Sequence, residues 1–230
     1  MIKKTTKAIV LKRVDYGDYD RIITALTPDM GKISMLVKGV RKINSKLAGG
    51  IELFAIFDAD FVNGRGEMGH LTSARLEEFC GNIIKDISRV RLGYQILRSF
   101  DRNLESNVES DYFYLLCQLL RLLNEELIPI VDIEIYFKSS MLMLAGHAPN
   151  LFTDNRDESL SREDKYNLSI DSMTLNKSSN GRLSSDHIKL LRLLFTPHEG
   201  QKIFKIKLNN HEDDQLKPLI DAMFSAYLSV

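Results

Sequence analysis

The spacing of apolar residues changes once along this chain, near Cys80, and this change constrains the fold more than any other feature. Before it, alternate residues are apolar, as at Ile51, Leu53, Ala55, Phe57, Ala59 and Phe61. A period of two places such residues on one face of a strand. After it, apolar residues step mainly by three and four, as at Ile83, Ile87, Val90, Tyr94, Leu97 and Leu104. This spacing forms one stripe along a helix, so a β domain followed by a helical domain is predicted.

Five short strands are predicted in the first part of the chain: Ala8–Val14, Arg21–Thr27, Lys32–Val40, Ile51–Val62 and Glu67–Leu76. Turn residues separate them, including Pro28, Gly31 and the pair Asn63 and Gly64, which is a strong hairpin signal. Five short antiparallel strands with no intervening helix are typical of a small barrel such as an OB-fold. We therefore expect residues 1–79 to form a five-stranded OB-fold domain that binds nucleic acid.

The remaining residues, 80–230, are predicted to form a mainly helical, all-α domain, which makes the fold class α+β. The expected helices are Ile83–Leu104, Asp111–Glu126 capped by Ser110, one from Pro129 to Gly146, one capped by Ser184 and ending at Phe195, and Asp214–Val230. The start of the third, residues 131–135, also alternates like a strand, and this alternative stays open. Residues 147–182 are polar and are expected to form an insertion with short β pieces near 166–170.

Composition excludes several classes of protein. Two cysteines, Cys80 and Cys117, are too few for a disulfide framework or a four-cysteine zinc site, and their small or apolar neighbours predict buried, inert thiols. The five histidines show no metal-ligand spacing, so no metal or other cofactor is expected. No apolar run approaches the roughly 18 residues of a membrane span, and we expect no secretory signal, because Lys7, Lys12 and Arg13 interrupt the apolar residues near the N-terminus. We expect a cytoplasmic protein.

Two patterns resemble sites of catalysis or ligand binding, and each has a structural explanation. Residues 64–69 match G-x-G-x-x-G, but that motif binds dinucleotides only between a strand and a helix, and here a hairpin turn is expected. Asp15, Asp18 and Asp20 lie in a turn, where carboxylates bond backbone amides; Asp18 and Asp20 could also pair with Arg21. No catalytic constellation is present, so we do not expect an enzyme. An enzyme with an unrecognised site remains the alternative.

The charge of the chain is unevenly distributed, although 31 Lys and Arg balance 31 Asp and Glu. Residues 1–76 hold 13 basic and 8 acidic residues, a balance of +5, which leaves 18 basic and 23 acidic residues, or −5, in the remainder. The segment 32–47 contains no acid and five cations: Lys32, Lys38, Arg41, Lys42 and Lys46. Such a cluster is either a solvated loop or a source of positive potential that attracts phosphates. On an OB barrel, strands and loops of this kind form the nucleic-acid groove.

The order of motifs resembles the family of the bacterial recombination mediator RecO. The matching segments are Ala8–Leu11, Tyr16–Arg21, Thr27–Lys32, Lys38–Arg41 with Ser45 and Lys46, Leu71–Ala74 and Gly146–Leu151. The resemblance implies an OB-fold followed by a helical domain, binding of single- and double-stranded DNA, and annealing of complementary strands. It also implies that the protein acts at the nucleoid with two partners, SSB, bound through its acidic tail, and RecR, and that together they load RecA onto SSB-coated single strands.

The resemblance extends to individual residues. The basic positions that match are Arg21, Lys32, Lys38, Arg41 and Lys46, and Lys42 is added because of its charge; these six are the expected DNA-binding residues. Many members carry a four-cysteine zinc module just after the position of Leu151, and this chain has no cysteine there, so no metal is implied.

A contact with the SSB tail requires an apolar pocket rimmed by cations. The first helix offers Arg89, Arg91, Arg98 and Arg102 for this rim. The alternative is a solvated helix face with pairs such as Arg98 and Asp101.

The sequence therefore predicts a non-enzymatic DNA-binding and strand-annealing recombination mediator that acts in DNA repair. The alternative is an OB-fold adaptor that binds RNA or protein and does not anneal DNA.

Overall fold

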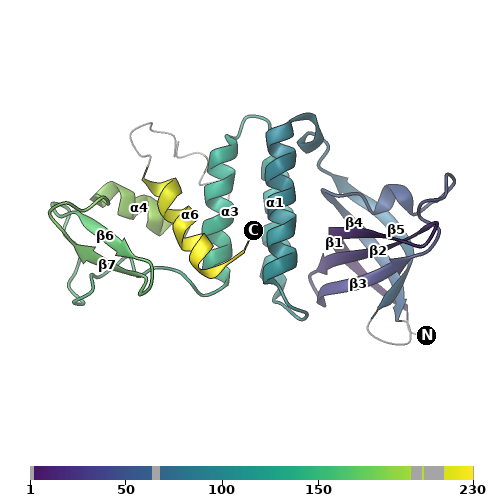
Figure 1. The fold of residues 1–230 in the computed structure, drawn as a ribbon, viewed down its shortest axis with the longest axis horizontal. Helices are drawn as coiled ribbons and strands as arrows, with labels where there is room; N and C mark the ends of the chain where they lie inside the picture. The colour runs from purple at the N-terminus through teal and green to yellow at the C-terminus, as the bar shows by residue number, and fades with distance from the viewer. Residues whose placement is uncertain (1–2, 64–67, 198–203, 205–214, 230) are drawn as a thin grey trace. The chain divides into compact units, whose positions relative to one another are not determined.

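The computed structural model describes residues 3–63, 68–197, 204 and 215–229 (Figure 1). It divides into two compact units, one within residues 1–127 and the other within residues 128–229. None of the helices in the described ranges is long and apolar enough to cross a membrane.

The first unit contains a closed five-stranded barrel (Figure 1). Its strands are β1 (Lys3–Tyr16), β2 (Asp20–Thr27), β3 (Gly31–Val37), β4 (Ala55–Asn63) and β5 (Gly69–Phe79). They are joined in the order β1-β2-β3-β5-β4, and β1 closes the barrel on β4. All pairs are antiparallel except β3 and β5, which run parallel where Met35 meets Gly69. This arrangement confirms the α+β class and the predicted barrel.

Alternating side chains of the strands fill the barrel. The buried residues are Ala8, Val10, Ile23, Ala25, Met35, Val37, Phe57, Ala59, Phe61 and Leu71. Because successive side chains of a strand point to opposite faces, the residues between them lie on the outer face of the barrel. On β4 these are the charged Asp58 and Asp60, whereas Ile9 on β1 is apolar and fully buried. The apolar alternation of the sequence therefore marks the inside of the barrel.

Several strand limits differ from those predicted. Strand β1 begins at Lys3, five residues early, because Lys3–Ile9 pair with β4 as the partner that closes the barrel. Strand β4 begins only at Ala55, since the short helix η1 (Ala48–Gly50) and a positive φ of 62° at Phe54 interrupt the extended backbone. Strand β3 ends at Val37 because Gly39, with φ of 63°, turns the chain. The turn predicted over residues 64–69 lies largely outside the described residues.

Two helices complete the first unit: α1 (Ile87–Asn103) and α2 (Ser110–Asn124). A separate turn, η2 (Ile83–Lys85), precedes α1, because Asp86 caps the helix by accepting hydrogen bonds from the amides of Ser88 and Arg89. The predicted helix from Ile83 is therefore two elements. Ser110 is the first residue of α2, and Glu109, not Ser110, occupies the cap position.

Helix α1 packs against the barrel at a glycine. A methyl group on Gly93 would lie 2.7 Å from Cε1 of Phe54, whose buried ring also contacts Tyr94 edge to face. Only a residue without a Cβ permits this approach. The barrel and its first helices are thus one packed unit. The sheet itself ends at Phe79, and the predicted domain boundary between residues 79 and 80 stays a prediction.

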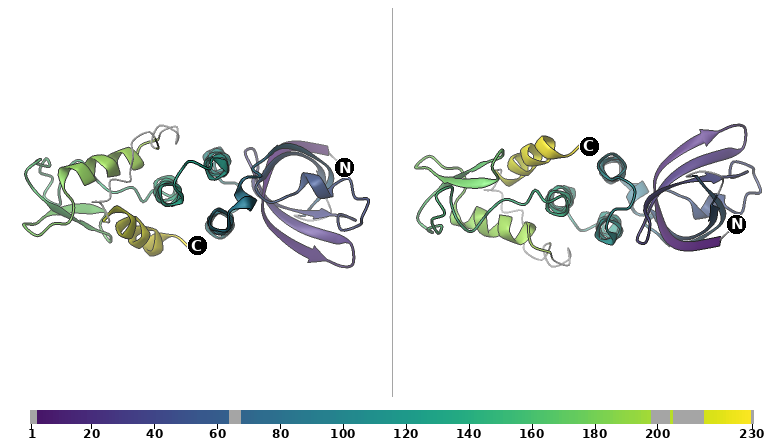
Figure 2. Two further views of the ribbon diagram at one scale, coloured as in Figure 1. Left: turned by 90° about the horizontal axis from the view of Figure 1, so that it is seen from above. Right: turned by 90° about the horizontal axis from the view of Figure 1, so that it is seen from below.

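In its described residues, the second unit contains α3 (Ile130–Leu144), β6 (Tyr166–Ser169), β7 (Thr174–Lys177), α4 (Ser185–Leu194) and α6 (Leu216–Tyr227). Residues 131–135 are helical, so the strand alternative is wrong there. Ser184 caps α4 as predicted, with its amide donating to Nδ1 of His187 at 3.0 Å. Helices α4 and α6 lie between the β6–β7 hairpin and α3 (Figure 2).

The polar insertion, residues 147–182, is held by internal hydrogen bonds and by contacts with α4 and α6. Nε of Arg192 donates to the carbonyl of Leu151 at 2.9 Å, and the hydroxyl of Tyr227 donates to the carbonyl of Ile170 at 2.7 Å. The carboxylate of Asp154, 5% exposed, accepts hydrogen bonds from the amides of Arg156 at 2.8 Å and Glu158 at 3.0 Å. Tyr166 and Leu175 of the hairpin are buried. A turn centred on a buried carboxylate therefore follows Leu151, where the resemblance places a zinc module in other members.

Candidate nucleic-acid interface

The loop that follows β3 is fixed to the turn between β1 and β2. The carboxylate of Asp20 accepts a hydrogen bond from the amide of Gly39 at 2.7 Å, and the amide of Arg41 donates to the carbonyl of Tyr19 at 3.0 Å. Both bonds use groups that a solvated loop would leave to water. The basic loop therefore has a defined position on the barrel.

Three of the predicted cations, Lys38, Arg41 and Lys42, are exposed on this loop. The Nζ atom of Lys42 lies 5.4 Å from the centroid of the Tyr19 ring, within the range of a cation–π contact. Beside it is an open depression of about 450 Å³, lined by Asp18, Tyr19, Asp20, Lys38, Gly39 and Lys42. Cations and an aromatic ring are thus adjacent on one surface.

Arg21 joins this surface through a shared carboxylate. Its Nε donates to Asp15 at 2.9 Å, and Nε of Arg41 lies 3.5 Å from the other oxygen of the same carboxylate. The hydrogen bond from Arg21 and the charge of Arg41 lower the pKa of Asp15 from its ordinary value. Arg21 therefore pairs with Asp15, not with Asp18 or Asp20 as considered from the sequence.

The other two predicted cations occupy different surroundings. Nζ of Lys32 donates to the backbone carbonyl of Asp101 at 2.6 Å, and its side chain is only 22% exposed, so Lys32 ties β3 to the end of α1. Lys46 is exposed, beyond Ser45. We define the basic surface as Arg21, Lys38, Arg41 and Lys42, which the structure brings together; Lys46 follows in the same loop.

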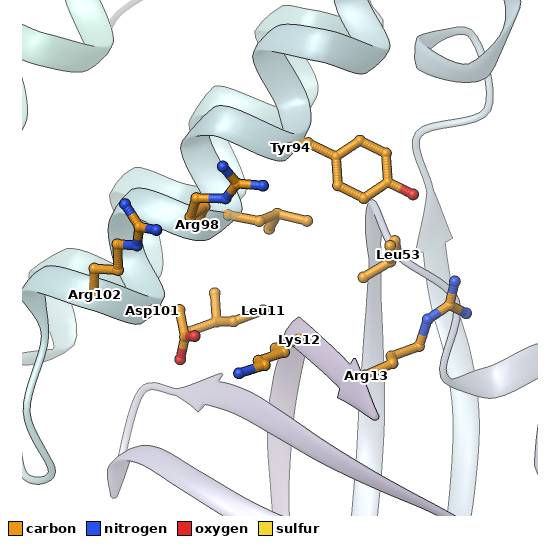
Figure 3. Close-up of a pocket in the computed structure, with 9 residues that line it drawn as sticks. Leu11, Lys12, Arg13, Leu53, Tyr94, Arg98, Asp101 and Arg102 are labelled. Carbon is orange, nitrogen blue, oxygen red and sulfur yellow. The ribbon is translucent and has the colours of Figure 1, made fainter. Parts of the chain in front are cut away.

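A second basic feature is a pocket between β1 and α1 (Figure 3). Its volume is about 450 Å³, and it is lined by Leu11, Lys12, Arg13, Leu53, Tyr94, Leu97, Arg98, Asp101 and Arg102. Figure 3 shows Arg98 and Arg102 projecting from α1, with Lys12 and Arg13 on the side of the barrel. Four cations and one acid therefore surround an apolar floor. We call this feature the rimmed pocket.

Four arginines were predicted to form the rim of a pocket for the SSB tail. Two of them, Arg98 and Arg102, line the rimmed pocket. Arg91 is exposed elsewhere on α1. Arg89 is 5% exposed and donates to the backbone carbonyls of Leu123 at 2.8 Å and Glu126 at 2.9 Å. Its charge is used inside the unit, so its assignment to an exposed rim is corrected.

Lys12 and Arg13 were not identified from the sequence as part of this rim. The outward positions of a strand are visible in the sequence, but the packing of α1 beside β1 is a tertiary contact. No local pattern indicates it.

Both cysteine thiols are buried, with Cys80 1% and Cys117 6% exposed, as predicted. Burial raises the pKa of Cys80 to about 12 and that of Cys117 to about 11. Within the described parts of the chain, no group of three or more His, Cys, Asp or Glu residues is placed to hold a metal ion.

Comparisons with known proteins give one family. A family model described as "Recombination protein O N terminal" matches residues 1–79. DNA repair protein RecO of Desulfatibacillum aliphaticivorans is 31% identical over 150 residues, which cover 64% of this chain and 58% of that protein. RecO of Roseiflexus sp. is 32% identical over 148 residues, covering 64% and 51%. In these two cases the match spans little more than half of the relative.

Other relatives match over most of their length. DNA repair protein RecO of Exiguobacterium sp. is 26% identical over 239 residues, which cover 99% of this chain and 91% of that protein. The similarity therefore includes both compact units.

Proposed function

We propose that this chain, whose first 79 residues match the RecO N-terminal family model and whose whole length resembles RecO proteins, binds DNA in repair and recombination. The observation that carries the proposal is the docked loop of the barrel, which holds Lys38, Arg41 and Lys42 exposed beside Tyr19. Exposed cations on a fixed loop neutralise phosphates without reading bases. We expect binding that is indifferent to sequence.

The same surface supports strand annealing without an enzymatic step. Two DNA strands repel each other through their phosphates, and cations that neutralise these charges reduce the repulsion. Base complementarity then drives pairing. This mechanism needs cations and open access, which the basic surface offers, and it requires no catalytic side chain.

We propose the rimmed pocket as the contact for the acidic tail of SSB. Arg98, Arg102, Lys12 and Arg13 supply positive charge for acidic side chains, and Leu11, Leu53 and Leu97 supply an apolar floor for a hydrophobic chain end. A partner bound in the rimmed pocket would not occupy Lys38, Arg41 and Lys42, which do not line that pocket and so remain accessible to DNA. Binding of RecR, loading of RecA, and action in the cytoplasm at the nucleoid complete the proposed role and rest on the resemblance to RecO.

A salt-dependent titration tests the proposal. A labelled single-stranded oligonucleotide is titrated with the protein at several salt concentrations, and binding is followed by fluorescence anisotropy. About four neutralised phosphates predict a log–log slope of affinity against salt near −3 for single strands. A slope near zero contradicts the electrostatic mechanism.

Adding the complementary strand to the bound complex tests annealing. Duplex formation faster than without protein supports the mediator role. Retained binding of RNA together with no acceleration would favour the alternative, an OB-fold adaptor.

A further inference from the structure

The aromatic ring of Tyr19 lies beside the cations of the basic surface, but the electrostatic mechanism gives it no role. Tyr19 is 54% exposed and lines the open depression together with Lys38 and Lys42. Its backbone carbonyl accepts the hydrogen bond from the amide of Arg41, and Lys42 Nζ lies near the ring. These contacts hold an exposed aromatic ring next to two cations, an arrangement suited to a planar ligand that carries negative charge.

We propose that this depression is a site for one unpaired nucleotide, in which the base stacks on Tyr19 and the phosphate lies against Lys38 and Lys42. The proposal rests on the proposed DNA binding and deepens it, because it names an unpaired base, and not only the phosphate chain, as the ligand. A volume of about 450 Å³ is in the range of small-ligand sites.

The two carboxylates of the depression orient the nucleotide. The carboxylate of Asp20 accepts a hydrogen bond from the amide of Gly39 and so helps to fix the loop, whereas Asp18 is exposed. A carboxylate repels a phosphate, so the phosphate is directed to Lys38 and Lys42. The base then faces Tyr19.

An unpaired base is required because stacking needs a free face. In a duplex, each base is already stacked on its neighbours, and removing it from the stack costs free energy. The cations bind the phosphates of single strands and duplexes alike, but Tyr19 adds affinity only for single strands. The site therefore gives the barrel a preference for unpaired DNA.

Two oligonucleotides with equal charge separate stacking from electrostatics. One is oligo(dT), and the other has the same length and phosphates but abasic sugars. We expect the wild-type protein to bind oligo(dT) about fivefold or more tightly than the abasic strand, since one base–aromatic stack contributes at least this factor. Tyr19→Leu should bring the ratio close to one and leave the salt slope unchanged. Tyr19→Phe, which keeps the ring, should retain the wild-type ratio.

Tyr16 offers a matched control on the same hairpin. It is 56% exposed but does not line the depression, so Tyr16→Leu should leave the ratio at its wild-type value. Circular dichroism of each variant verifies the fold.

Two results would overturn the inference: equal binding of both strands by the wild-type protein, or a ratio that Tyr19→Leu does not change. In either case salt-dependent binding of both strands would leave the proposed function intact. If neither strand binds at low salt, the proposed function itself fails, and the nucleotide site fails with it.

Discussion

The guanidinium of Arg89, near the start of α1, donates a hydrogen bond to the backbone carbonyl of Leu123, near the end of α2, at 2.8 Å. A second bond, to the carbonyl of Glu126 at 2.9 Å, uses the other terminal nitrogen. The last carbonyls of a helix have no partner within the helix, and a cation there also complements the helix dipole. A single buried arginine thus joins the two helices of the first unit.

Arg89→Met should destabilise this unit. The substitution keeps much of the apolar stem but leaves two carbonyls without these donors, which should lower the free energy of unfolding by about 3 kcal/mol. Denaturation in urea measures the change. Arg91→Met, at an exposed position of the same helix, should change it by less than about 0.5 kcal/mol. Equal effects of the two substitutions would contradict the structural role of Arg89.

The thiols of Cys80 and Cys117 should resist alkylation in the folded protein. Burial raises the pKa of Cys80 to about 12 and that of Cys117 to about 11, so at pH 8 at most on the order of one thiol in a thousand is ionised. Iodoacetamide labelling followed by mass spectrometry should show slow modification that accelerates in denaturant. Fast labelling of the native protein would contradict the burial.

The raised pKa values also predict how stability depends on pH. Above the ordinary thiol pKa of 9.0 the unfolded chain loses protons that the folded chain keeps. Stability contributed by the buried thiols should therefore fall as the pH rises from 9 towards 11. Replacing both cysteines with alanine should reduce this dependence in thermal melts recorded across that range.

The barrel could be predicted from the sequence because the signals for its strands and turns are local. Alternating apolar residues and turn residues are read along the chain, and the inward set, such as Phe57, Ala59 and Phe61, matches the pattern. The strand limits were less accurate where a single backbone angle decides them, as at Phe54 and Gly39. At Gly39 the glycine itself permits the positive φ, whereas at Phe54, which is not a glycine, the positive φ depends on tertiary packing that local patterns do not contain.

The sequence also predicted only part of the candidate site. A run of cations without acids indicated the loop of Lys38, Arg41 and Lys42, because this feature is local. The same run included Lys32, which is bonded to Asp101, and the helix pattern included Arg89, which is buried. Charge in the sequence does not reveal which cations have internal partners. Only the fold separates those that face solvent.

Replacing Lys38, Arg41 and Lys42 together with alanine should weaken DNA binding at every sequence alike. Three fewer phosphate contacts should reduce the magnitude of the log–log salt slope for single strands by about 2. Anisotropy titrations at several salt concentrations measure this. A matched control replaces Lys165, Lys177 and Lys189, which are exposed and lie in the second unit, and removes the same net charge. If both triple variants lose the same affinity, binding depends on net charge alone and the basic surface is assigned wrongly.

Asp15→Asn should strengthen DNA binding. The carboxylate lies between Arg21 and Arg41, and its depressed pKa keeps it ionised at neutral pH. Without this negative charge, Arg21 and Arg41 attract phosphates more strongly. The affinity for DNA should therefore rise about two- to fivefold in low salt, and the gain should shrink as salt screens the charges. Asp186→Asn on α4 removes the same charge from an exposed pair with Lys189 and should leave affinity nearly unchanged. Weaker binding of Asp15→Asn would indicate instead that the carboxylate is needed to position the two arginines.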